Sequence, residues 1–241
     1  MWKDQSGCKM GRSPEPYGTI LSDRVLAVLE KHKEDKPCLS DVKAFVYDML
    51  EPTPDRGDML YRYEHSVRVA ENGTIIAEAE GLPREELRIA RMLHDVGYRE
   101  CRMFEDFQRH PFISADIANL YLRRIGFEGA MLQEMVRGIA LHNLSDQLPE
   151  DMTPFQMSVR DSDDIDRFDM IRTAMILGDC THEKTNAEIL RCCEQQIESA
   201  KWILALKRGT RTAEKMIRED CEKRIALLQD LIRQAKKGFE E

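Results

Sequence analysis

The chain has 241 residues, of which 42% are apolar and 33% charged, a composition typical of a soluble globular protein. Its formal net charge is −8 at pH 7, which argues against a broad basic surface for extended nucleic acid but allows a small phosphate ligand held by a few arginines. No apolar run approaches the roughly 20 residues that a membrane-spanning helix needs, so we expect no membrane partner.

The cysteines follow no disulfide or zinc framework. Their number is odd, no Cys-x-x-Cys pair occurs, and the N-terminus carries no signal-peptide pattern. These features predict a cytoplasmic, reducing environment. We therefore expect all seven to be free thiols or small buried apolar residues: Cys8, Cys38, Cys101, Cys180, Cys192, Cys193 and Cys221.

The predicted elements begin with a loose terminus over residues 1–18, where Gly, Pro, Ser and charges mix without a period. Apolar residues at helical spacing then predict two helices within residues 19–57, with Ser22 and Ser40 as N-caps. The stretch "EPTPDRGD" reads as a loop.

A long helix is predicted over residues 59–80, because the pattern stops at Gly81, a typical C-terminal signal. Pro83 opens the helix of "RIARMLHDVGYRE". A further helix is expected to start next to Pro111 and to end at Gly126.

The pattern "EGAMLQEMVRGIALHNL" predicts the next helix, and residues 155–178 predict one or two more. Two long amphipathic helices follow over 186–207 and 211–237, hinged at Gly209-Thr210. No strand or hairpin signal occurs in the sequence. The fold class is therefore predicted to be all-α.

The histidines divide into two groups. His32 and His182 have polar neighbours and are expected to be exposed. The others lie on or beside apolar helical stripes of four successive predicted helices: His65, His94, His110 and His142. A single histidine on an apolar face is usually a hydrogen-bonded core residue, but four on successive helices suggest a shared site.

Carboxylates complete this set. Asp95 adjoins His94, and Gly97 would permit a turn that brings both side chains to one side. "VRDSDDIDRFD" places several aspartates among apolar residues, which is costly without a cation or donors nearby. Imidazole with carboxylate is a ligand set for divalent Mn, Fe, Co, Ni or Zn.

The ordered segments "YRYEHSVRVA", "ARMLHDVG", "HPFISADIANLYLRRIG", "ALHN" and "RDSDDID" resemble the HD-domain superfamily of metal-dependent phosphohydrolases. The resemblance covers residues 58–180. "TRTAEKMIREDCEKRIALLQDLI" also resembles the C-terminal helix of some small bacterial members. The Gly-Tyr-Pro extension of the cyclic dinucleotide phosphodiesterases is absent, since no proline follows in "HDVGYRE".

The resemblance implies a helical HD core over 58–180, which follows the flexible terminus over 1–18 and the helices of 19–57. A helical hairpin over 181–241 is expected to pack on this core. It also implies one or two divalent ions (Mn, Fe, Co, Ni, Zn or Mg). His65, His94, Asp95 and Asp163 match the one-metal ligands, and His110 and His142 match those of two-metal members, with Asp95 as the bridge. Asp166 is a rival for Asp163.

The implied reaction cleaves a phosphoester of a nucleotide or another small phosphate ester with metal-activated water. Asp95 would orient or deprotonate the water. Arg62 is the first choice to bind phosphate and assist catalysis, and Arg99, Arg109 and Arg160 are further candidates. "YRECRMFEDFQR" is predicted to form a mobile lid or substrate loop.

Two other functions fit the same residues. The six ligands also resemble those of HD-type di-iron oxygenases, which would consume oxygen. A non-catalytic metal-binding or scaffold protein is the third reading, because long C-terminal helices often form homodimers.

Overall fold

A computed structural model describes residues 16–51, 58–101, 104–144 and 148–237, and for 104–106 the backbone only. Within these ranges the protein is all-helical, without strands, which confirms the predicted fold class. The core helices are α1 (Asp23–Lys31), α2 (Leu39–Leu50), α3 (Asp58–Glu80), α4 (Arg84–Leu93), the short 3-10 helix η2 (Tyr98–Glu100), α5 (Phe104–Arg124), α6 (Gly129–Leu141) and α7 (Pro154–Phe168). Beyond them lie α8 (Met170–Thr181), α9 (Asn186–Ala205) and α10 (Arg211–Lys236). None of the described helices is long and apolar enough to cross a membrane.

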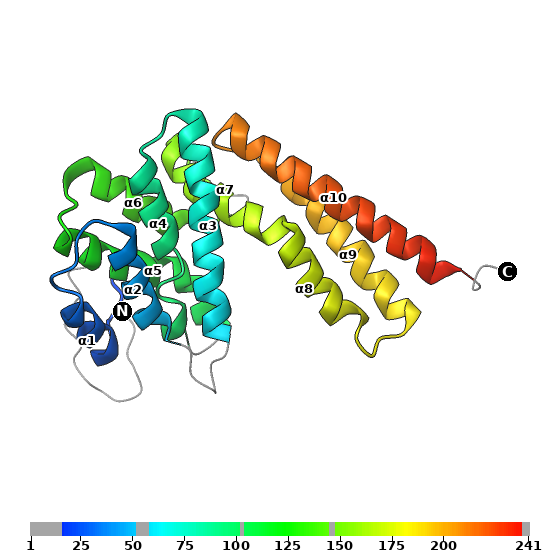
Figure 1. The fold of residues 1–241 in the computed structure, drawn as a ribbon, viewed down its shortest axis with the longest axis horizontal. Coiled ribbons are helices and arrows are strands. Elements are labelled where there is room, and N and C mark those ends of the chain that lie inside the picture. Colours follow the sequence, from blue (N-terminus) through cyan, green and yellow to red (C-terminus); the bar gives the residue numbers. More distant parts are fainter. Residues whose placement is uncertain (1–15, 52–57, 102–103, 145–147, 238–241) are drawn as a thin grey trace.

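Helices α1 to α7 gather on one side of the molecule (Figure 1). A continuous apolar cluster of buried side chains joins them. The N-terminal helices contribute to it, since Phe45 of α2 stacks on Tyr121 of α5 with ring centroids 3.8 Å apart. Ser22 caps α1 as predicted by accepting a hydrogen bond from the backbone N–H of Val25. Cys38 rather than Ser40 is the N-cap residue of α2, and it makes no side-chain cap bond. The predicted "EPTPDRGD" loop and terminus lie largely outside the described residues.

The helix boundaries largely follow the predicted start and stop signals. Gly81 has a φ of 66° just after α3, a conformation that glycine adopts without strain, and Pro83 is the N-cap of α4. The prediction for α5 was wrong at its start, because this helix begins at Phe104 and contains Pro111 in its interior. Since Pro111 has no N–H, the carbonyl of Phe107 loses its helical donor.

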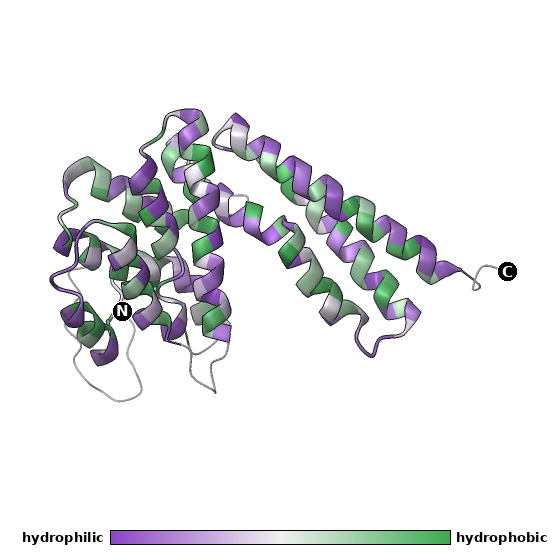
Figure 2. Cartoon of the chain, in the orientation of Figure 1, coloured by the Kyte–Doolittle hydropathy of each residue, from purple (hydrophilic) through white to green (hydrophobic). Residues whose placement is uncertain are grey.

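The last three helices form an arm that extends away from the core (Figure 1). α9 and α10 run antiparallel, and Figure 2 shows apolar residues recurring among hydrophilic ones along both. At the end near Gly209 the hairpin meets the core, where α10 packs against α7 and α3. Thr212 donates its backbone N–H to Glu80 there, at 2.7 Å. Among the described residues, the expected packing on the core is thus concentrated at this end.

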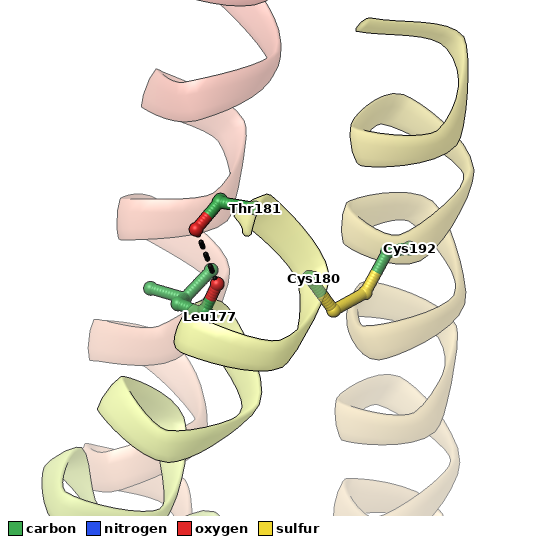
Figure 3. The surroundings of a disulfide bond; sticks show 4 residues. All are labelled: Leu177, Cys180, Thr181 and Cys192. Carbon is green, nitrogen blue, oxygen red and sulfur yellow. Dashed lines mark hydrogen bonds between the residues drawn. A yellow bond between two sulfur atoms is a disulfide. The ribbon is translucent and has the colours of Figure 1, made fainter. Parts of the chain in front are cut away.

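A disulfide joins Cys180 of α8 to Cys192 of α9 (Figure 3). This pair contradicts the expectation that all cysteines are free. The two Cα atoms are 6.1 Å apart, within the range that a disulfide spans, because α8 and α9 pack side by side. The expectation holds for exposed Cys38 and for three buried thiols: Cys101, Cys193 and Cys221.

The prediction that His32 is exposed was also wrong. It lies at the C-terminal end of α1 and is 7% exposed, because aspartates contact both ring nitrogens. Nδ1 lies 2.9 Å from Asp35 and Nε2 lies 2.7 Å from Asp48. His182 is exposed as predicted.

Candidate metal centre

Four histidines from four helices point their Nε2 atoms into one buried region of the core. His65 lies in α3, His94 ends α4, His110 lies in α5, and His142 ends α6. All four residues are buried, with at most 8% of each exposed. The helical core therefore brings together the histidines that the sequence singled out.

The first half of this region consists of His65, His94 and Asp163. Nε2 of His65 lies 3.2 Å from Nε2 of His94 and 3.1 Å from Oδ1 of Asp163. Nε2 of His94 lies 3.9 Å from the same oxygen. The three ligand atoms are near enough to one another to share a single cation.

The second half consists of His110, His142 and Asp95. Nε2 of His110 and Nε2 of His142 are 3.2 Å apart. Oδ1 of Asp95 lies 3.2 Å from Nε2 of His110 and 3.7 Å from Nε2 of His142. His94, Asp95 and His142 also form a group that could hold a cation.

Asp95 stands between the two halves. Its Oδ2 faces the first half, 3.5 Å from Nε2 of His94 and 3.8 Å from Nε2 of His65. Its other oxygen faces His110 and His142. This arrangement agrees with the bridging position that the resemblance implies for Asp95.

The outer ring nitrogens are held by acceptors that fix the tautomers. Nδ1 of His94 donates to the carbonyl of Arg91 at 2.7 Å, and Nδ1 of His142 donates to that of Ile139 at 2.7 Å. Both carbonyls lie in the last turn of a helix, where helical donors run out. Nδ1 of His110 donates at 2.6 Å to the carbonyl of Phe107, which Pro111 leaves free.

These hydrogen bonds place the protons of the neutral rings on Nδ1 and leave a lone pair on each Nε2. Two Nε2 lone pairs facing each other at 3.2 Å repel, unless a cation or an added proton lies between them. A buried set of four imidazoles and two carboxylates suits a divalent metal ion, so the residues fit the cofactor that the HD resemblance implies.

The ionisation states follow from these contacts and from burial. Burial opposes charge on Asp95, but His94 and His110 hold its pKa well below the usual value. Burial lowers the pKa of His94 well below the usual value, so this ring is neutral. Burial acts the same way on His65, but hydrogen bonds to Asp163 and Asp166 outweigh it and raise its pKa to about 9.

Asp166 occupies a different position from Asp163. Its Oδ2 accepts a hydrogen bond at 2.7 Å from Nδ1 of His65, the nitrogen that faces away from the centre. Nε of Arg68 donates to the other oxygen of Asp166, Oδ1, at 2.6 Å. The structure thus favours Asp163 as the ligand and Asp166 as the carboxylate that orients His65.

A cavity of about 240 Å³ opens over the centre. Arg62 lines it as predicted, with Nη1 3.3 Å from Oδ2 of Asp95 and the guanidinium 3.8 Å from the ring centroid of Tyr98. Other lining residues were not predicted from the sequence: Tyr61, Tyr98, Asn143, Arg167 and Arg172. The arginines give the cavity positive groups opposite the carboxylates.

The other predicted arginines lie elsewhere. Arg99 donates to backbone and side-chain oxygens of Glu51 at the end of α2 and does not line the cavity over the metal centre. Arg109 is exposed and does not line the cavity described above. Arg160 is buried against Asp161 and lines an adjacent cavity.

The predicted lid between His94 and His110 is helical over most of its described length. Tyr98–Glu100 form η2, Cys101 follows as its C-cap, and residues 104–109 form the first turns of α5. Phe107 and Gln108 line the cavity, so this segment does contribute to its wall. Residues 102 and 103 lie outside the described residues.

Gly97 has a role different from the predicted one. Its φ is −85°, which any residue can adopt, so the turn after Asp95 does not require glycine's conformational freedom. A Cβ at this position would lie 2.7 Å from the backbone nitrogen of Ser114. Glycine therefore allows η2 to lie directly against α5.

Residues 62–171 match the HD domain family, and this range includes the four histidines and the aspartates of the buried cluster described above. The chain contains an HD domain. A crystal structure of a predicted HD superfamily hydrolase from an uncultured Thermotogales bacterium shares the HD fold, with a TM-score of 0.58 and 20% identity. The similarity covers 86% of this chain and 98% of that one. No curated protein matches the chain.

Proposed function

We propose that this HD-domain protein is a metal-dependent phosphohydrolase that acts on a small phosphate ester, with nucleotides as the leading class. One observation carries the proposal: a single cavity joins the buried His/Asp cluster to three arginines, Arg62, Arg167 and Arg172. Guanidinium groups bind phosphate oxygens through paired N–H donors.

A divalent ion in this centre would supply activated water and neutralise charge on the phosphoryl group. Asp95 stays ionised, since its pKa is well below the usual value, so it suits holding and orienting a water molecule better than removing its proton. Arg62 lies beside it and would hold a phosphate oxygen. Tyr98 accepts a hydrogen bond from Arg62 at 2.8 Å, which fixes that guanidinium at the cavity wall.

The oxidative alternative uses the same ligands. An iron-loaded HD centre could activate oxygen, and the ligand set does not distinguish the two chemistries. The arginine-lined wall favours a phosphate-bearing substrate in either case.

The test is phosphate release from a panel of nucleoside monophosphates and ribose 5-phosphate, by protein loaded in turn with Mn, Co or Fe. We expect metal-dependent release that a chelator abolishes and that Asp163→Asn lacks. Oxygen consumption by the iron form, without phosphate release from any ester, would instead establish the oxidative reaction. No metal uptake and no reaction would leave a helical binding protein.

A further inference from the structure

A second cavity, also of about 240 Å³, adjoins the one over the metal centre. The two share Gln108, His142, Asn143 and Arg167 as lining residues. Pockets for small organic ligands usually measure about 300–1,000 Å³. Neither cavity reaches that size by itself, whereas the two together do.

The far wall of the second cavity comes from the arm. α9 contributes Trp202 and Ile203 to it, and Leu206 follows as the C-cap residue of this helix. Trp202 is 47% exposed, although a tryptophan gains more than other residues from burial. Leu144 adds another apolar group from the core side. A partly exposed indole therefore lines a cavity that shares part of its wall with the cavity over the metal centre.

The remaining wall is polar. Arg160 is 2% exposed, and its Nη1 is buried without a hydrogen-bond partner in the described structure. Asp164 forms an ion pair with Arg208, whose Nη1 lies 2.6 Å from Oδ2 of the carboxylate. Arg167 lines both cavities and is 48% exposed in its side chain, so it lies between the two chambers. An indole face with a few polar groups suits a flat ring that carries donors and acceptors at its edge.

We propose that the second cavity binds the organic part of the substrate, and that Trp202 stacks on a planar nitrogenous ring such as the base of a nucleoside monophosphate. The phosphate would lie in the first cavity, and Arg167 would contact the link between them. The inference rests on the proposed phosphohydrolase function. It makes α9 of the arm a part of the substrate site and Trp202 a residue that determines specificity.

The experiment uses the two tryptophans of the chain, Trp2 and Trp202. In a Trp2→Phe protein loaded with Zn, all tryptophan fluorescence comes from Trp202. We would mix it rapidly with each of the four common ribonucleoside monophosphates, and with ribose 5-phosphate, which lacks only the base. We expect saturable quenching by at least one nucleotide and none by ribose 5-phosphate.

Kinetics provide the second measurement. Stacking on an aromatic side chain typically strengthens binding of a base by about tenfold or more. Trp202→Ala should therefore raise the KM of the best nucleotide by about that factor, and leave the KM of ribose 5-phosphate within about twofold. Trp202→Phe, which keeps a ring, should restore most of the affinity.

Three results would overturn the inference. If Trp202→Ala raised the KM of the nucleotide and of ribose 5-phosphate equally, Trp202 would have a general structural role. Phosphate release by the wild type would then still support the proposed function. Absence of quenching by all four nucleotides, with ribose 5-phosphate still hydrolysed, would exclude a base on Trp202. No release from any ester would remove the proposed function and this inference together.

Discussion

Nδ1 of His65 donates a hydrogen bond to Oδ2 of Asp166 across 2.7 Å, which turns Nε2 of the same ring toward the metal centre. The carboxylate is 1% exposed in its side chain and also accepts from Arg68. Carboxylates that hold the outer nitrogen of a ligating histidine fix both its tautomer and its orientation.

Asp166→Asn should therefore weaken metal binding without removing a ligand. We expect affinity to fall roughly 10- to 100-fold, the usual effect of losing such a partner, with the number of bound ions unchanged at saturation. Asp163→Asn is the matched variant and should lose an ion. A competition titration against a coloured chelator measures the affinity and the number of bound ions. If Asp166→Asn lost an ion and Asp163→Asn only bound metal more weakly, Asp166 would be the ligand instead.

Pro111→Ala should separate helix stability from metal binding. The new N–H can donate to the carbonyl of Phe107, so α5 gains a helical bond and an interior proline that costs about 3 kcal/mol is removed. The same donor competes with Nδ1 of His110 for that carbonyl. We expect a higher Tm in chelator but weaker binding at the His110 position, by roughly tenfold.

Pro83→Ala is the control for this experiment, because Pro83 is the N-cap of α4 and displaces no interior helical bond. Its metal affinity should match the wild type. Unchanged metal affinity in Pro111→Ala would show that the Phe107 carbonyl does not orient His110.

Gly97→Ala should destabilise the fold next to the metal centre. The added Cβ would meet the backbone of Ser114 at 2.7 Å and a side-chain carbon of Ile113 at 2.8 Å. Overpacking of this kind typically costs about 1–3 kcal/mol. Denaturant unfolding measures the loss, together with a lower metal affinity, because Asp95 precedes Gly97 by two residues.

Gly178→Ala is the opposite case in the same chain. Gly178 is exposed within α8 and has open space around its missing Cβ, so alanine should stabilise the helix by up to about 1 kcal/mol. If Gly97→Ala had the same free energy of unfolding as Gly178→Ala, the close contact between η2 and α5 would not explain the glycine at position 97.

Arg62→Ala should raise the KM for a phosphate ester roughly tenfold or more, since hydrogen bonds to charged groups contribute about 1.5–3 kcal/mol. Arg99→Ala should leave KM unchanged, because Arg99 binds Glu51 at the end of α2. Steady-state kinetics on the same ester compare them. A KM effect confined to Arg99→Ala would contradict the placement of phosphate in the cavity.

The Cys180–Cys192 pair predicts a cross-linked peptide in a digest made without reductant. Closing a loop of this length stabilises a protein by about 2–3 kcal/mol in the chain-entropy account. Cys192→Ser should therefore lower the free energy of unfolding by that amount. Cys38→Ser, at an exposed free thiol, should change nothing. Alkylation of both Cys180 and Cys192 in unreduced protein would contradict the bond.

Features that depend on neighbouring residues could be predicted from the sequence. Gly81 marked the C-terminal end of α3 and Pro83 marked the start of α4. Apolar periodicity identified the helices that carry the histidines. The ligands could be grouped because they recur on successive helices. Their spacing alone did not separate Asp163 from Asp166, since the choice depends on which nitrogen of His65 each one meets.

The cavity walls could not be predicted in the same way. Asp169 ends α7 and caps α8, and the resulting bend directs Arg172 to the hydroxyl of Tyr61, 111 residues earlier in the chain. Arg99 was a further candidate for binding phosphate, but η2 turns it toward Glu51 at the end of α2. Such contacts depend on how whole helices cross, which local patterns do not encode.

Asp95 gives one oxygen to each pair of histidines, and this sharing has a thermodynamic consequence. An ion drawn to either oxygen withdraws charge from the carboxylate and fixes its rotation, so it alters the free energy available to an ion at the other. By reciprocity, each ion must change the affinity for its neighbour by the same factor. We therefore expect a half-loaded protein to be a distinct species with its own affinity, and not the average of the empty and full forms.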